Sequence, residues 1–289
     1  MSFSSDVKSE LCQIKSHKSC CLVSECAGML LFSRSLTDEK ISFYTDFDFV
    51  AEHLCYLIKK RLKITAEHII TDGGVNKVEV MSKHDRETIV ARMKNGDKPA
   101  DGLIQNECCL GAFLRGVFLS CGNLTDPNKE YRLEFICPSR LMAQYLYGFL
   151  SGIIENPKMA EREGVYYVYY KHSEAVEDML TLVGAANAAL EVMEIKVEKD
   201  MRNKLNRVNN FENANLAKTV NAAVDQTEAI EKIIAAGKLD SLSEALRETA
   251  ILRKENPDSS LSQLCKISGC SRSGLNHRLK RLIEIANEL

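Results

Sequence analysis

Apolar and polar positions in the first 185 residues follow the same order twice, and this repetition predicts two similar halves. Each half opens with an apolar helix that contains small residues, at Cys21–Phe32 and at Cys109–Cys121. Gly28 corresponds to Gly116, 88 positions later by the difference of their residue numbers. Chance similarity among common α/β elements is the alternative, and the matching order of six elements argues against it.

The same five elements are predicted after each of these helices: a strand, a helix, two strands and a helix. In the first half they are Lys40–Thr45, Phe49–Leu62, Thr65–Thr71, Val75–Met81 and Asp85–Lys94. In the second half they are Glu130–Cys137, Ser139–Ile153, Lys158–Arg162, Val165–Lys171 and Ser173–Val183. Alternating β-branched and aromatic residues support the strands, and Gly73, Gly74 and Gly164 predict tight turns between them. We therefore predict an α+β domain of two pseudo-symmetric α-β-α-β-β-α halves over residues 1–189, with Asn95–Gln105 as the linker.

Strand signals end near Leu190, and residues 190–224 read as a basic, Asn-rich helical connector. Two interpretations of its charges carry equal weight: a solvated helix face, or contacts to the DNA backbone. The residues in question are Arg202, Lys204, Arg207 and Lys218.

Residues 225–289 show capping signals in the order expected of a helix-turn-helix. The predicted helices are Thr227–Ala236, ending at Gly237, a helix opened by Ser241–Glu244 that runs to about Glu255, a short helix to about Ser268, and Arg272–Glu288. Capping boxes are predicted at Ser241–Glu244 and Ser260–Gln263, and Gly269 is expected to break the chain before Ser271 caps the last helix. Cys265 supplies a small side chain where the two helices of the motif cross.

The last helix has one apolar face and one cationic face. Leu275, Leu279 and Leu282 form the inward stripe. Between Cys270 and Leu282 the chain carries four Arg or Lys residues and no acid, which suits a groove lined by phosphates. The predicted DNA-binding residues are Arg272, Ser273, Asn276, His277, Lys280 and Arg281. A small helical dimerisation domain is the alternative reading of these helices.

Composition narrows the remaining classes of function. The 289 residues have a net charge of -2 and 45% apolar residues, which is ordinary for a globular chain. The eleven cysteines include no CxxC, and the adjacent pairs Cys20-Cys21 and Cys108-Cys109 lack zinc-ligand spacing, so we expect reduced cysteines, no metal and no cofactor. No apolar run approaches the roughly 20 residues of a membrane span. None of the six histidines, His17 among them, lies beside a signature for an activated nucleophile.

The two glycine-bearing helices resemble the nine-residue LAGLIDADG motif of homing endonucleases, over Cys26–Arg34 and Leu114–Gly122. In those enzymes the acid at the eighth motif position binds a divalent metal. Here that position holds Ser33 in one half and Cys121 in the other, and the often acidic sixth position holds Leu31 and Leu119. Because Mg²⁺ needs hard oxygen ligands, the resemblance implies a degenerate domain without catalytic residues.

The whole chain resembles the WhiA-type transcriptional regulators of Gram-positive bacteria. The resemblance rests on the opening Ser2–Lys8, the Asn-rich run from Arg202 to Ala223, and Ser273–Leu279 in the last helix. It implies a cytoplasmic, nucleoid-associated, non-enzymatic regulator that binds double-stranded DNA in sporulation, or in cell division and chromosome segregation. The N-terminal sheet either adds weak DNA affinity or is a protein- or ligand-binding platform, and we expect the second. An active nuclease with other metal ligands, or an interaction scaffold without DNA binding, are the alternatives.

Overall fold

The computed structural model describes residues 2–15, 18–96 and 98–289. His17, and Asp97 of the predicted linker, lie outside the described residues. The chain forms two compact units, Met1–Lys199 and Asp200–Leu289, and each is described by itself.

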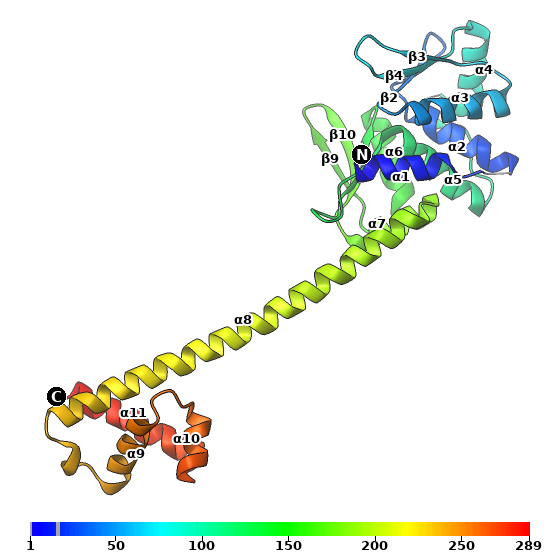
Figure 1. The fold of residues 1–289 in the computed structure, drawn as a ribbon. Coiled ribbons are helices and arrows are strands. Elements are labelled where there is room, and N and C mark those ends of the chain that lie inside the picture. The colour runs from blue at the N-terminus through cyan, green and yellow to red at the C-terminus, as the bar shows by residue number, and fades with distance from the viewer. Residues whose placement is uncertain (1, 16–17, 97) are drawn as a thin grey trace. The chain divides into compact units, whose positions relative to one another are not determined.

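The first unit contains two halves with the same sheet topology (Figure 1). All neighbouring strands are antiparallel, and the orders are β1-β2-β4-β3 and β7-β8-β10-β9. The strands of the first half are β1 (Ser35–Leu36), β2 (Ile41–Thr45), β3 (Glu67–Ile70) and β4 (Asn76–Glu79). Those of the second are β7 (Gly122–Leu124), β8 (Leu133–Cys137), β9 (Lys158–Arg162) and β10 (Val165–Tyr170). The predicted repeat is therefore confirmed, and each half has one short strand more than predicted, β1 or β7.

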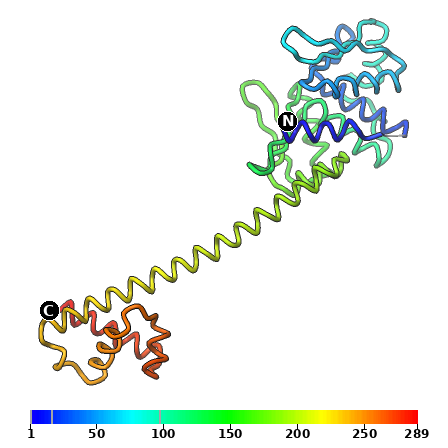
Figure 2. Tube along the Cα trace, viewed as in Figure 1, coloured from blue at the N-terminus to red at the C-terminus, as the bar shows by residue number. Residues whose placement is uncertain are grey.

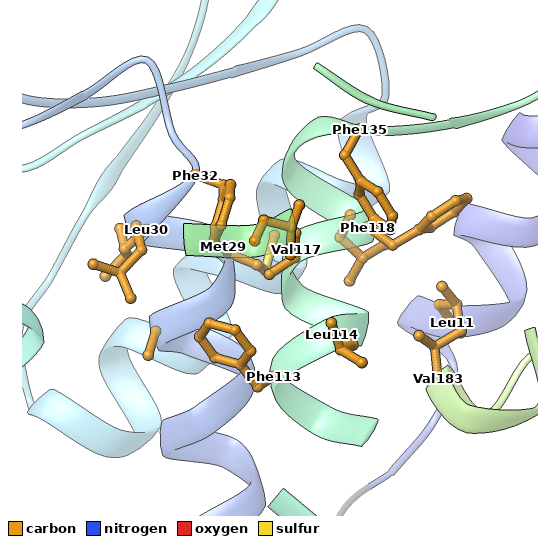
Figure 3. Packing of buried hydrophobic residues seen from close by; sticks show 14 of the residues in the cluster. Leu11, Met29, Leu30, Phe32, Phe113, Leu114, Val117, Phe118, Phe135 and Val183 are labelled. Atoms are coloured by element: carbon orange, nitrogen blue, oxygen red, sulfur yellow. The ribbon is translucent and has the colours of Figure 1, made fainter. Parts of the chain in front are cut away.

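Each half also repeats the same three helices. They are α2 (Ser19–Leu31), α3 (Asp48–Leu62) and α4 (Lys83–Met93) in the first half, and α5 (Glu107–Cys121), α6 (Arg140–Ser151) and α7 (Ser173–Val183) in the second. The glycine-bearing helices α2 and α5 pack against each other at the centre of one shared hydrophobic core. In that core Met29 and Phe32 of the first half meet Phe113 and Val117 of the second (Figure 3).

Gly28 and Gly116 let the backbones of α2 and α5 touch. A Cβ on Gly28 would lie 2.2 Å from the carbonyl oxygen of Phe113, and a Cβ on Gly116 would lie 2.1 Å from that of Glu25. Both distances are far below van der Waals contact, so only glycine fits at this crossing.

Several short elements were missing from the sequence prediction. Helix α1 (Phe3–Cys12) precedes the first half, and its N-cap Ser2 accepts a hydrogen bond from the amide of Ser5. Strands β1 and β7 have only two or three residues, too few for alternation to reveal. The predicted linker contains β6 (Lys98–Pro99), which pairs with β5 (Lys94–Asn95) as a small hairpin.

Helix α8 (Ala186–Ala235) is one unbroken helix of 50 residues (Figure 2). Its first turn is capped by Glu10 of α1, whose carboxylate accepts hydrogen bonds from the amides of Asn187 and Ala188 at 2.8 and 3.1 Å. A carboxylate at this end of a helix also complements the helix dipole. The predicted segment boundaries at 189/190 and 224/225 fall inside α8 and stay predictions.

The second unit is all helical and has its own core. After α8 come a short 3-10 turn (Leu239–Ser241), α9 (Glu244–Glu255), α10 (Leu261–Ser268) and α11 (Arg272–Asn287). Ile230 and Ile233 of α8 pack with Ala250, Leu264 and the leucines of α11.

One predicted capping box is wrong and the other is confirmed. Ser241 lies in the 3-10 turn, where its hydroxyl donates to the carbonyl of Lys238, so Ser243 is the N-cap of α9. Among the described residues, no backbone amide donates to the Ser243 side chain. In contrast, Ser260 and Gln263 form both hydrogen bonds of a capping box at α10. Ser241 and Ser243 are only two positions apart, so the sequence did not determine which of them is the N-cap of α9.

Candidate nucleic-acid interface and the centre between the two halves

The turn between α10 and α11 is built from three residues, Gly269 to Ser271. Gly269 has φ 71° and donates its amide to the carbonyl of Cys265, which ends α10 in a left-handed cap. Ser271 then caps α11 by accepting a hydrogen bond from the amide of Gly274. A short helix, a glycine turn and a capped second helix are thus present as predicted.

Helix α11 presents its predicted contact residues to solvent and its leucines to the core. Leu275, Leu279 and Leu282 are buried. The exposed predicted residues are Arg272, Ser273, His277, Lys280 and Arg281, and Asn276 is half-buried beside them. The structure therefore brings this set together on the accessible side of one helix.

Positive charge is concentrated between Arg272 and Arg281 of α11, where the chain has no acid. The guanidinium of Arg281 donates to Glu284 at 2.8 Å, so this cation is already paired within the helix. Arg278 is half-buried and donates to the sulfur of Cys270 at 3.7 Å. Arg272 and Lys280 are consequently the better placed cations for a phosphate or a base.

Arg253, which the sequence prediction missed, shapes the loop before α10. Its side chain is buried at the end of α9, and one guanidinium nitrogen donates to the carbonyls of Asn256, Pro257 and Ser259 at 3.2, 3.4 and 2.6 Å. Burial lowers the pKa of Arg253 below its ordinary value. These bonds hold the carbonyls that precede the capping box, so Arg253 positions α10.

The four basic residues predicted as backbone contacts all lie on α8. Arg202, Lys204, Arg207 and Lys218 are exposed, together with every other residue from 201 to 222. Their accessibility fits either a solvated face or phosphate contacts.

A cavity in the first unit lies where the two degenerate motifs end. It is lined by residues of both halves, among them Ser33, which follows α2, and Cys121, the last residue of α5. Lys8 of α1 and Asp46 after β2 line the same cavity. The motif positions that carry acids in homing endonucleases therefore come together here, but with other side chains.

These residues do not fit a divalent metal. The hydroxyl of Ser33 is directed to the carbonyl of Leu30 at 2.6 Å. Burial, together with a hydrogen bond with Cys137, raises the pKa of Cys121 well above its ordinary value, so it stays a neutral thiol. Among the described residues of this cavity, Asp46 is the one carboxylate, whereas Mg²⁺ prefers several hard oxygen ligands.

Lys8 adds a positive charge at the same place. Its side chain is buried, and its ammonium group lies 5.6 Å from the ring centre of Phe47 and 5.9 Å from that of Phe118. Burial lowers the pKa of Lys8 below its ordinary value, and the opposing effect of the nearby Cys121 and Asp46 is smaller. An ammonium group fixed beside the motif positions repels a metal cation.

A buried ion pair joins the two halves near the glycine crossing. Arg115 of α5 donates to Glu25 of α2 at 2.9 Å and to the carbonyl of Val183 at 3.0 Å, and His53 of α3 lies 2.7 Å from the other carboxylate oxygen. Burial raises the pKa of Glu25, but the hydrogen bonds with His53 and Arg115 outweigh it and leave the pKa below its ordinary value. Arg115 stands where the motif has alanine, and this departure was a signal that the sequence prediction did not use.

Comparison with known proteins decides the family. Residues 110–202 match the WhiA LAGLIDADG-like domain, and residues 205–286 match the WhiA C-terminal HTH domain. A protein of Alkaliphilus metalliredigens named "Probable cell division protein WhiA" is 36% identical, covering 99% of this chain and 98% of its own length. The chain belongs to the WhiA family. A WhiA protein of Ruminiclostridium cellulolyticum is 33% identical over 100% of this chain and 98% of its own.

Solved WhiA structures share this fold. The crystal structure of full-length DUF199/WhiA from Thermatoga maritima matches with a TM-score of 0.63 and 25% identity, covering 100% of this chain and 99% of that one. The N-terminal LAGLIDADG domain of DUF199/WhiA matches with a TM-score of 0.51 and 21% identity, covering 63% of this chain and 92% of that one. The α+β LAGLIDADG-like domain and the all-helical helix-turn-helix domain are therefore both confirmed.

In the described ranges, no helix is both long enough and apolar enough to pass through a bilayer.

Proposed function

We propose that this WhiA-family chain is a non-enzymatic regulator that binds double-stranded DNA in a sequence-specific way through α11. Two features together carry the proposal. The capped helix α11 has an accessible cationic face, and the motif positions hold Ser33 and Cys121 beside the ammonium group of Lys8. The first suits the major groove, and the second opposes metal-dependent cleavage.

The cellular role in the proposal is transcriptional control of cell division and chromosome segregation, or of sporulation. The relatives' name, cell division protein, supports the first of these roles. Such a regulator acts in the cytoplasm, at the nucleoid. We assign the N-terminal unit to protein or ligand binding, because the aromatic side chains of strand β10 suit packing against a partner.

Two substitutions on α11 test the sequence-specific part. Asn276 offers an amide that can pair with an adenine edge, whereas Lys280 offers a charge that a phosphate binds regardless of sequence. We expect Asn276→Ala to weaken a cognate duplex about ten- to a hundredfold with little effect on random DNA. Lys280→Ala should weaken both duplexes alike, and Asn287→Ala, exposed at the far end of α11, serves as the matched control.

The cognate duplex comes from sequencing genomic fragments that co-immunoprecipitate with the protein, and affinities come from fluorescence anisotropy at fixed salt. Equal losses on cognate and random DNA in both variants would remove the base-reading role of Asn276. Binding to neither duplex would leave the interaction scaffold as the function.

A plasmid assay tests the non-enzymatic part. We expect supercoiled plasmid to remain intact with the full-length protein and Mg²⁺ or Mn²⁺. Nicking by the purified protein that is lost in Arg272→Ala or Lys280→Ala would instead show an active nuclease.

A further inference from the structure

Four cysteine thiols from two distant parts of the chain meet at one end of the central helix pair. Cys20 and Cys21 begin α2, and Cys108 and Cys109 begin α5. The four sulfur atoms all lie within 4.8 Å of one another. The two pairs have the same spacing of 88 positions as Gly28 and Gly116, so the pseudo-symmetry of the two halves creates the cluster.

Spacing within each pair predicted no metal site, because zinc ligands from a single loop are usually separated by two or more residues. Here each half supplies one pair, and packing of α2 on α5 brings the pairs together.

The distances suit a single metal ion. Four thiolates at about 2.3 Å from a tetrahedral Zn²⁺ have their sulfur atoms about 3.8 Å apart, so the observed cluster needs only a small contraction. The four thiolates of a [4Fe–4S] cluster bind four different iron atoms, and those of a [2Fe–2S] cluster are divided between two, so in both they lie farther apart than four thiolates that share one ion. The cluster therefore favours one thiophilic ion.

The surroundings of the cluster favour thiolates. The N-termini of α2 and α5 both point their positive dipole ends at it. Lys18 and Arg61 line a cavity together with Cys20, and the guanidinium of Arg61 donates to Ser19, the first residue of α2. A Zn²⁺ ion with four thiolates carries a net charge of about 2−, which these positive groups offset.

A contact inside the cluster already joins the two halves. The thiol of Cys21 donates to the carbonyl of Cys108 at 3.3 Å, a bond that a metal ion would replace.

We propose that Cys20, Cys21, Cys108 and Cys109 form a structural tetrathiolate site for Zn²⁺. The ion joins the two halves at the N-terminal end of the α2–α5 pair, opposite the end that carries Ser33 and Cys121. Binding replaces four sulfur–hydrogen bonds by four sulfur–zinc bonds and releases the thiol protons to solvent, without oxidation or reduction.

Metal analysis of the untagged, full-length protein purified under reducing conditions tests the site. We expect one zinc per chain, and after zinc removal we expect Co²⁺ to produce the visible absorption of a tetrahedral thiolate complex. The variants Cys20→Ser and Cys108→Ser change the two more accessible thiols and should lose the zinc and the Co²⁺ absorption. Cys55→Ser, a partly buried thiol of α3 in the same unit, is the matched control and should keep both.

A second readout separates metal binding from folding. Zinc should raise the melting temperature of the wild type and of Cys55→Ser but not of Cys20→Ser/Cys108→Ser, while circular dichroism shows all of them folded. The proposal is overturned if the reduced wild type holds neither zinc nor Co²⁺, or if the double variant binds as the wild type does. An iron–sulfur spectrum after anaerobic purification, or disulfides among the four cysteines in protein freshly purified under reducing conditions, would also overturn it.

Discussion

Gly28 and Gly116 set the distance between the two halves at the scale of single residues. An ideal Cβ on either glycine would lie 2.2 or 2.1 Å from a backbone carbonyl oxygen of the opposite helix, well inside van der Waals contact. Neither position has a positive φ, so the requirement is one of space between helices and not of backbone conformation. The sequence repeat identified the two glycines as equivalent positions, and the packing of α2 on α5 shows the role that they share.

Gly28→Ala should destabilise the first unit by about 1–3 kcal/mol or more, because the new methyl group must push the backbones of α2 and α5 apart. Gly148→Ala, in the middle of α6, is the matched control: its Cβ would meet open space, and alanine favours the helix by about 0.5–1 kcal/mol. Urea unfolding followed by circular dichroism measures both changes. Equal midpoints for the two variants would contradict the close crossing.

Glu25 should give the first unit a measurable pH dependence. Its pKa is lowered in the folded state, so its contribution to stability is complete above the ordinary value of 4.5 and is lost as the pH falls through the folded pKa. Glu25→Gln leaves Arg115 without its carboxylate partner and should cost about 3 kcal/mol at pH 7. The difference from the wild type should shrink below pH 4.5, as measured by urea unfolding at several pH values.

Glu174→Gln is the control for this comparison, because Glu174 is exposed and its partner Lys196 lies on the surface of α8. We expect a much smaller loss from this exposed pair. A Glu25→Gln variant that matches Glu174→Gln at pH 7 would show that the buried pair adds little.

At the scale of elements, the sequence correctly predicted the features that leave a periodic pattern or a turn residue in the chain. The longer elements of the two halves follow the predicted order, and the left-handed glycines at 164 and 269 stand at predicted turns. Helix α1 was missed because its polar Ser, Asp, Lys and Glu residues hide a narrow buried face around Val7 and Leu11. Two groupings could not be predicted from neighbouring residues in the sequence, because they depend on packing between distant segments. Lys8 lies in the same cavity as Cys121, and Cys20 lies close to Cys108.

The two N-caps of the second unit provide an internal comparison. In Ser260→Ala the amide of Gln263 loses the hydroxyl oxygen that accepts its hydrogen bond, so one of the two bonds of the capping box is gone. We expect this change to destabilise α10 by about 1 kcal/mol. Ser243→Ala should cost less, because the described residues give its side chain no capping hydrogen bond. Amide hydrogen exchange in the first turns of α10 and α9 reports the two effects separately, and equal protection losses would contradict the assignment of the caps.

At the scale of the whole molecule, α8 belongs to both compact units and carries the four basic residues whose role the sequence left open. A cation that binds a phosphate releases counterions from the DNA, so each such cation steepens the fall of affinity with salt. The slope of log affinity against log salt therefore reports how many phosphates the protein neutralises.

If α8 binds the DNA backbone, replacing Arg202, Lys204, Arg207 and Lys218 by alanine should reduce this slope by about one for each phosphate that is no longer neutralised. We expect a reduction, because Arg272 and Lys280 alone can neutralise few phosphates. Lys129→Ala, an exposed lysine of the first unit, is the control and should leave the slope unchanged. An unchanged slope in the fourfold variant would assign these charges to a solvated face.

The paired glycines have a consequence for how such a domain can diverge. The motif positions at the ends of the two helices can change side chain without disturbing the glycine contact, and here they hold Ser33 and Cys121 beside a cavity. Gly28 and Gly116 serve the contact between backbones, which is needed as long as the two halves fold together. Selection for a stable fold alone is enough to keep both glycines, so they can persist whatever side chains occupy the neighbouring motif positions.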